Sequence, residues 1–124
     1  MNRLDIQKTY KLYIGGKFPR TESGRYYPIN NGKGNLIANM CLASRKDFRN
    51  AVVATRNAQS SWAKQSALNK GQVIYRIAEM LEGRKEQFIA ELIAQGETIK
   101  SAKAEVNTSI DRLVYFAGWS DKYQ

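Results

Sequence analysis

The stretch of sequence that decides the fold is residues 44–62, SRKDFRNAVVATRNAQSSW. Ser44 and Asp47 at its start resemble a capping box, in which each side chain satisfies the other residue's backbone N–H where a helix begins. Apolar and small residues then recur every three or four positions, which is the spacing of one helix face. These recurring residues, called the 48–62 stripe below, are Phe48, Val52, Thr55, Ala58 and Trp62. The stretch therefore predicts an amphipathic helix.

Short strands are predicted on the amino-terminal side of this helix. Residues 11–14 and 17–18 flank Gly15 and Gly16, and glycine suits a two-residue hairpin turn because positive φ costs it little. Pro19 cannot donate a ladder hydrogen bond, so the second strand should end there or lie at a sheet edge.

Two more strands are predicted after this hairpin. Residues 26–29 and residues 35–42 are rich in apolar and aromatic side chains, and residues 30–34 between them have the composition of a turn. Residues 1–9 are polar and are expected to form a loose arm.

Three further helices are predicted beyond residue 64. Ser66 and Thr98 have N-cap side chains, Gly83 should end or kink the second helix, and Gln95-Gly96 should close the third. The apolar stripes of the second and third helices are Val73, Ile74, Ile77, Ala78 and Leu81, and Phe88, Ile89, Leu92 and Ile93. The stripe of the fourth is Ile99, Ala102, Val106, Ile110, Leu113, Val114 and Ala117.

These elements predict an α+β fold that is mainly helical, with about four amphipathic helices and a small amino-terminal β region. The expected regions are the arm at 1–9, a hairpin and strand region at 10–42, and a helical region at 43–124. The apolar stripes are wide for so short a chain. They predict either a four-helix core or surfaces that cover a sheet belonging to more polypeptide.

Composition restricts the class of protein. A chain of 124 residues and 14.1 kDa makes one domain or part of one. Its hydrophobic fraction of 43% and charged fraction of 25% are ordinary for a soluble globular protein. No apolar run approaches the roughly 20 residues of a membrane span, and no secretory signal is expected at the amino end. Because a single cysteine cannot form an internal disulfide, we expect a cytoplasmic location.

The sequence contains no histidine. A Ser-His-Asp triad, a Cys-His pair and a zinc site with histidine ligands are therefore excluded. Catalysis by this chain would have to use lysine, tyrosine, cysteine or a carboxylate, which disfavours a self-contained enzyme.

The charge is unevenly distributed along the chain. Residues 1–64 hold 12 Lys/Arg and 3 Asp/Glu, a net charge of +9, whereas residues 65–124 hold 8 of each and are neutral. A basic half can attract a phosphate backbone, but its cations are spread singly and form no dense helical face. The charge therefore favours a solvated surface, or one that meets an acidic partner, over nucleic-acid binding.

Four groups of residues could carry chemistry, and a structural role is favoured for each. Cys41 lies in an apolar strand without a base to activate it, and Gly32-Lys33-Gly34 lacks the frame of a phosphate-binding loop. Four glutamates are explained as solvated charge, and four aromatic residues as a packing or docking edge. They are Glu79, Glu82, Glu86 and Glu91, and Tyr115, Phe116, Trp119 and Tyr123. We therefore assign no catalytic, cofactor-binding or metal-ligating residue to this chain.

Several segments resemble, in order, motifs of the NAD(P)-dependent aldehyde dehydrogenase superfamily. Residues 12–18, LYIGGKF, resemble the family's opening (L/F)-(Y/F)-I-(G/N)-G-x-(W/F), and residues 28–38 resemble its N-P-a-t-G-e stretch. Residues 44–62 are similar to s-x-x-D-v-x-x-A-V-x-a-A-x-x-A-x-x-x-W, residues 74–82 to L-x-x-i-A-d-l-i-E, and residues 111–122 to a block ending in y-y-A-G-W-A-D-K. Each block is short, but the ordered set is specific.

The resemblance implies that this chain is the amino-terminal structural portion of an oxidoreductase that oxidises an aldehyde to an acid with NAD or NADP. In the family a thiolate attacks the aldehyde, hydride passes to the nicotinamide, and water releases the acid. The family's catalytic cysteine, glutamate base, oxyanion-binding asparagine and nucleotide-binding strands have no counterpart in this chain, and Cys41 does not match the nucleophile. The chain departs from the family at residues 96–98. The family's common (E/D)-x-G-K-P element has a proline there, and this chain has none.

The resemblance also implies scaffold roles, since this segment of the family supplies a β hairpin and helices that buttress the cofactor-binding domain. Gly15 and Gly16 should form a turn. The aromatic residues near the end of the chain should dock against a partner surface. The residues expected to pack are Phe48, Val52, Trp62, Ile77, Leu81, Leu92, Val106, Ile110 and Leu113. The expected partner is the remainder of the dehydrogenase or a second copy of the chain, with no membrane. Two alternatives stay open: a self-associating helical interaction module and a basic nucleic-acid binder.

Overall fold

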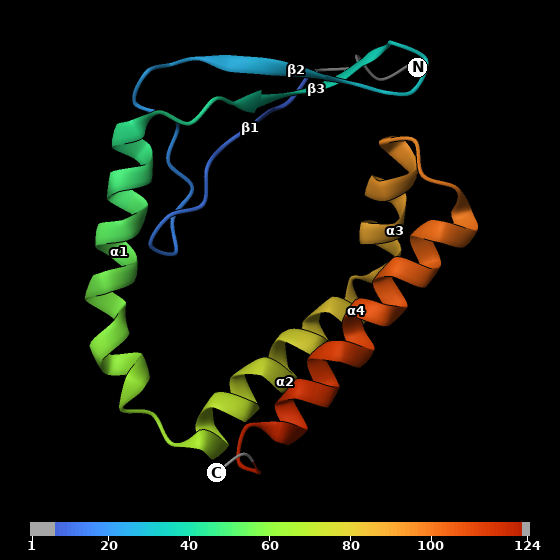
Figure 1. The fold of residues 1–124 in the computed structure, drawn as a ribbon. Coiled ribbons are helices and arrows are strands. Elements are labelled where there is room, and N and C mark those ends of the chain that lie inside the picture. Colours follow the sequence, from blue (N-terminus) through green and yellow to red (C-terminus); the bar gives the residue numbers. More distant parts are fainter. Residues whose placement is uncertain (1–6, 123–124) are drawn as a thin grey trace. The chain divides into compact units, whose positions relative to one another are not determined.

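The computed structural model describes residues 7–122, in which three strands precede four helices (Figure 1). The strands are β1 (Thr9–Tyr10), β2 (Tyr26–Asn30) and β3 (Leu36–Cys41). The helices are α1 (Arg45–Ala63), α2 (Ala67–Gly83), α3 (Lys85–Ala94) and α4 (Ile99–Trp119). The predicted α+β class, with four helices and a small β region, is confirmed. Most of the arm predicted at 1–9 lies outside the described residues.

The chain divides into two compact units, residues 1–63 and residues 64–124, called unit 1 and unit 2 below. Unit 1 contains the strands and α1, and unit 2 contains α2, α3 and α4. The two units are defined by the contacts between residues. The regions predicted at 10–42 and 43–124 are defined by the type of secondary structure, so the division into units does not test them and they stay a prediction.

The sheet of unit 1 has the strand order β1-β3-β2. Central strand β3 pairs in parallel with β1, where Thr9 lies opposite Asn39, and antiparallel with β2, where Ile29 lies opposite Ala38. Pro28 lies in β2, an edge strand, where a residue without an N–H is tolerated. The strands predicted at 26–29 and 35–42 therefore form with small shifts in their ends.

The glycine turn forms as predicted, but the strands beside it do not. Gly15 and Gly16 both have positive φ, 61° and 76°, as the tight two-residue turn of a hairpin requires. Ile14 and Lys17 form a single bridge, and the N–H of Leu12 donates to the carbonyl of Pro19 at 3.0 Å. Because Pro19 has no N–H, it cannot return that hydrogen bond. The strand prediction at 11–14 and 17–18 is therefore wrong.

The predicted helix ends are confirmed. The side chain of Ser66 accepts the N–H of Asn69 at 3.1 Å, and the side chain of Thr98 accepts the N–H of Ser101 at 3.1 Å. Helix α2 ends at Gly83, and Gly96, with φ of 110°, follows α3. These caps satisfy backbone groups that a helix leaves free at its ends.

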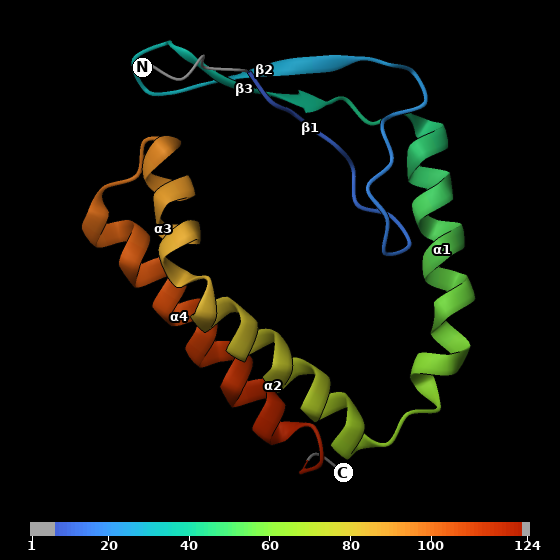
Figure 2. The same ribbon diagram turned by 180° about the vertical axis from the view of Figure 1, so that it is seen from behind.

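Helix packing holds unit 2 together. Helix α4 lies beside α2 and α3 in both views (Figures 1 and 2). Ile89 of α3 forms a buried cluster with the inward residues of α4, and Leu81 and Leu92 pack against that cluster. The inward residues of α4 are Ala102, Val106 and Ile110. The predicted packing of Leu81, Leu92, Val106 and Ile110 is therefore confirmed, and Leu113 is half-buried.

Four residues predicted to pack are instead exposed. The exposed fractions of Phe48, Val52, Trp62 and Ile77 are 71%, 40%, 46% and 50%. The prediction is wrong for these four within this chain because a stripe is buried only where the polypeptide supplies a second surface. In the described part of the chain, no helix combines the length and apolar character needed to cross a membrane.

Candidate functional site

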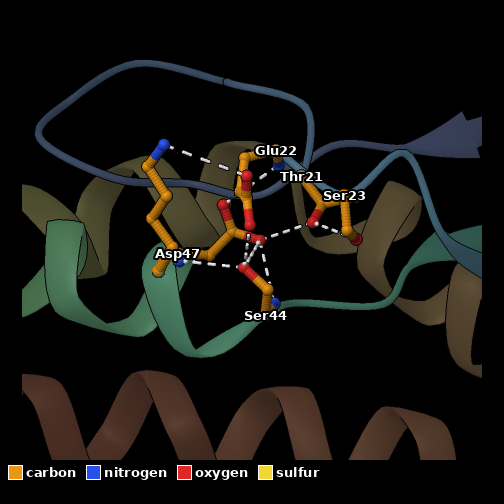
Figure 3. Close-up of polar contacts among 6 residues, drawn as sticks. Thr21, Glu22, Ser23, Ser44 and Asp47 are labelled. Carbon is orange, nitrogen blue, oxygen red and sulfur yellow. Dashed lines mark hydrogen bonds and ion pairs between the residues drawn. The ribbon is translucent and has the colours of Figure 1, made fainter.

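Asp47 forms a polar joint between the start of α1 and the loop at residues 21–23 (Figure 3). Its carboxylate accepts the N–H of Ser44 at 2.9 Å, and the hydroxyl of Ser44 accepts the N–H of Asp47 at 3.2 Å. This exchange confirms the predicted capping box. The same carboxylate also accepts the hydroxyl of Thr21 at 2.5 Å and the N–H of Glu22 at 3.2 Å. One side chain therefore caps the helix and holds a loop more than 20 residues away in sequence.

The hydrogen bonds of this joint favour the ionised carboxylate. They lower the pKa of Asp47 from 3.8 to about 2. The N–H of Ser44 contributes most and the hydroxyl of Thr21 contributes next. Asp47 and Thr21 are both buried, so the joint is shielded from water although its surroundings are polar. Because its hydrogen bonds are used to cap α1 and to hold the loop, we assign the joint a structural role.

A groove of about 930 Å³ lies beside α1 in unit 1. The glycine turn approaches the helix closely there, since a Cβ on Gly15 would lie 3.7 Å from the Cβ of Ala54. Tyr13 and Trp62 line the groove together with small residues of α1. Those small residues are Ala51, Ala54, Thr55 and Ala58. Because Thr55, Ala58 and Trp62 also belong to the 48–62 stripe, the groove continues that stripe.

A second groove, of about 570 Å³, lies between α2 and the end of α4 in unit 2. Gly71 is buried at this helix contact, and a Cβ there would lie 2.9 Å from the carbonyl oxygen of Ala117 and would clash with the hydroxyl of Ser120. The absent side chain lets the two helices approach. Tyr75 and Val114 line the groove together with charged residues.

The predicted aromatic edge forms on α4. The ring centroids of Tyr115 and Phe116 are 5.3 Å apart, and those of Tyr115 and Trp119 are 6.1 Å apart. All three side chains are exposed. Tyr123, the fourth aromatic residue of the prediction, lies outside the described residues. The edge is thus a surface that could dock a partner.

The turn at Gly32–Gly34 does not fit a nucleotide phosphate. Asn31 occupies the amides that would have to bind one, because its side-chain oxygen accepts the N–H groups of Lys33 and Asn35, each at 2.9 Å. The carbonyl of Asn31 accepts the N–H of Gly34 at 2.9 Å. A phosphate-binding loop needs free amides pointing at the ligand, so this segment is a turn between β2 and β3.

The remaining candidate groups do not come together. Cys41 is buried in β3 opposite Tyr26, and the four glutamates singled out in the sequence are all exposed on α2 and α3. Glu79 pairs with Arg76 at 3.7 Å, an exposed ion pair of little energetic weight. Within residues 7–122, no group of three or more cysteine or carboxylate side chains could hold a metal ion.

Sequence reasoning missed two structural residues. Thr21 was not recognised as a partner of Asp47, and Gly71 was not recognised as the contact point of α2 and α4. Gly71 could have been suspected, since glycine inside a helix costs about 1 kcal/mol relative to alanine and needs a packing reason. Thr21 carried no local signal.

Comparison with known proteins gives one consistent family. Residues 18–124 match the aldehyde dehydrogenase family. The cytosolic 10-formyltetrahydrofolate dehydrogenase of Mus musculus is 35% identical to this chain over all of its length, and the match spans 14% of the mouse protein.

Solved structures agree with the sequence match. An NAD-dependent benzaldehyde dehydrogenase from Corynebacterium glutamicum is 30% identical with a TM-score of 0.84, covering 89% of this chain and 24% of that one. An aldehyde dehydrogenase from Bacillus cereus is 25% identical with a TM-score of 0.88, covering 94% of this chain and 25% of that one. This chain thus spans about a quarter of these structures.

Proposed function

Because the chain belongs to the aldehyde dehydrogenase family and matches an amino-terminal segment of it, we propose that it is a scaffold of an enzyme that oxidises an aldehyde to an acid. The observation that carries the proposal is the match over residues 18–124. Its role would be to position polypeptide that holds the reactive cysteine and the nucleotide.

NAD or NADP is the cofactor that this proposal assigns to the whole enzyme, because the relative from C. glutamicum is named an NAD-dependent enzyme. The cofactor would accept hydride from the aldehyde carbon. The turn at residues 32–34 does not fit its phosphates, so no step is assigned to residues of this chain. We also propose a cytoplasmic location and assembly into oligomers.

A chimera tests the scaffold function. Residues 10–124 would replace the matching segment of the C. glutamicum benzaldehyde dehydrogenase, with the unaltered enzyme as control. We expect the chimera to fold and to reduce NAD with benzaldehyde, and the 124-residue chain alone to show no turnover. A chimera that is insoluble or inactive beside the active control would contradict the function, as would turnover by the isolated chain.

A self-associating helical module is the second candidate function. The exposed aromatic edge of unit 2, Tyr115, Phe116 and Trp119, favours it, because apolar patches on a surface mark interaction sites. Residues 65–124 carry no net charge, so two copies of this part would not repel each other strongly. Light scattering at high concentration tests this candidate, and a single monomeric species would count against it.

A further inference from the structure

We propose that one face of α1 is a docking surface for an acidic amphipathic helix of another protein. This face, called the arginine face below, consists of Arg45, Arg49, Val53 and Arg56. Carboxylates of the partner helix would meet the three arginines, and an apolar side chain between them would meet the valine. The inference goes beyond the proposed function and does not depend on it.

Helical spacing places the three arginines in one line. Arg49 follows Arg45 by four residues and Arg56 follows Arg49 by seven, and all three are exposed. At about 100° and about 1.5 Å per residue, they lie within about 40° of one another around the helix and within about 17 Å along it. Asp47 and Ala54, which meet the loop and the glycine turn, lie on the opposite side of α1. The arginine face therefore points away from the contacts that hold α1 in unit 1.

Unit 1 offers few carboxylates to these arginines. Within the described part of the chain, none of the three takes part in an ion pair. Residues 1–63 hold 11 Lys/Arg and 3 Asp/Glu. Of these carboxylates, Asp47 is used in the joint and Glu22 lies 3.9 Å from Lys46. A guanidinium can bind a carboxylate through two parallel hydrogen bonds, so the arginine face can accept three carboxylates from a partner.

Val53 adds an apolar contact to this face. It follows Arg49 by four residues and precedes Arg56 by three, so the three side chains are neighbours on the helix surface. Its exposed fraction is 50%, and the aliphatic stems of the arginines extend the apolar surface beside it. Such a surface is complementary to a helix that carries carboxylates next to apolar side chains.

A nucleic acid fits the arginine face less well. Surfaces that bind single strands combine cations with aromatic rings on which the bases stack, and the arginine face contains no aromatic residue. Phe48, the nearest aromatic residue of α1, belongs to the 48–62 stripe and lies about 80° around the helix from the centre of the arginine line.

A second copy of the chain also fits less well. It would bring the same positive face to the contact. Nowhere in the sequence do three carboxylate residues have the spacing of the arginines, in either chain direction. Charge and spacing therefore favour a helix of another protein.

Fluorescence anisotropy with labelled ligands tests the inference. The probe is a helical peptide of about 20 residues, in which three glutamates repeat the spacing of the arginines and leucines lie beside them. A peptide of the same composition in shuffled order tests whether spacing matters. An oligouridine of similar length tests the nucleic-acid alternative.

Two variants with the same loss of charge make the measurement specific. The test variant combines Arg45→Gln, Arg49→Gln and Arg56→Gln. The control variant changes three exposed cations of unit 1 that lie outside α1, Arg20→Gln, Arg25→Gln and Lys33→Gln. Glutamine and arginine have similar helix propensities, so α1 should form in both variants, and circular dichroism checks this.

We expect the unsubstituted chain and the control variant to bind the acidic peptide with similar dissociation constants. The test variant should bind about tenfold more weakly, which corresponds to about 1.4 kcal/mol and is within the range of three surface ion pairs. Added salt should weaken binding, since exposed charges are screened.

Three results would overturn the inference: no binding of the acidic peptide, equal binding by the two variants, or equal binding of the shuffled peptide. Tighter binding of the oligouridine, lost in the test variant, would also overturn it and make the partner a nucleic acid. The chimera measures the scaffold function separately, so each of these results would leave that function standing.

Discussion

Helices α1 and α4 have similar lengths and similar apolar stripes, but only α4 has a buried stripe. The 19 residues of α1 bury a single side chain, the polar Asp47, whereas the 21 residues of α4 bury Ala102, Val106 and Ile110. The difference arises because α2 and α3 lie against α4, while α1 meets a loop and a turn. A periodic apolar stripe therefore predicts that a helix packs against another surface. It does not predict whether that surface lies in the same chain.

The largest expected effect is the loss of the buried face of α4. Val106→Asp would place a charge among Ile89, Ala102 and Ile110, and an uncompensated buried charge costs about 3–5 kcal/mol. We expect unit 2 to unfold, as measured by urea titration followed by circular dichroism. Val114→Asp on the same helix is the control, because Val114 is 44% exposed. Equal losses of stability from both variants would contradict the distinction between the buried face and the exposed face of α4.

A second prediction concerns the helix contact at Gly71. Alanine at this position would be pushed against Ser120 and Ala117, and overpacking costs about 1–3 kcal/mol. We expect Gly71→Ala to lower the urea midpoint of unit 2 although alanine favours helices. In Gly118→Ala, the matched change on α4, the new Cβ meets no atom within 4 Å. We expect that variant to raise the free energy of unfolding by up to about 1 kcal/mol. If Gly118→Ala destabilised unit 2 as much as Gly71→Ala, the close approach of α2 and α4 at Gly71 would be contradicted.

A third prediction separates the two units by pH. The pKa of Asp47 is lowered to about 2 in the folded chain from 3.8, so its carboxylate stabilises unit 1 above pH 3.8. That stabilisation should be lost as the pH falls from 3.8 towards 2. Hydrogen exchange at the N–H groups of Ser44 and Glu22 would follow the loss. Asp47→Asn should show faster exchange already at neutral pH, with unit 2 unchanged, and an unaltered pH profile in this variant would argue against the joint.

The smallest expected effect is the loss of a cap in unit 2. Thr98→Ala removes the side-chain oxygen that accepts the N–H of Ser101, which typically costs about 1 kcal/mol. Thr98→Ser keeps that acceptor and should restore most of the stability. Thermal denaturation of the three proteins measures the difference, and a serine variant as unstable as the alanine variant would show that the cap is not the cause.

Several parts of the fold were predictable because their causes are local. The caps at Ser44, Ser66 and Thr98 and the turn at Gly15-Gly16 depend on residues within three positions of one another. The strands predicted at 11–14 and 17–18 do not form, because Pro19 has no N–H and so short a ladder cannot lose one of its hydrogen bonds. The joint between Asp47 and Thr21 spans 26 positions, a separation at which the sequence pattern carries no signal.

By itself, the sequence determined where helices begin and end and the resemblance to one enzyme family. Only the tertiary structure decided which stripes are buried, because burial depends on the surface that meets a helix and not on the helix alone. It showed that α4 finds this surface in α2 and α3, and that Phe48, Val52 and Trp62 of α1 stay exposed within the described residues.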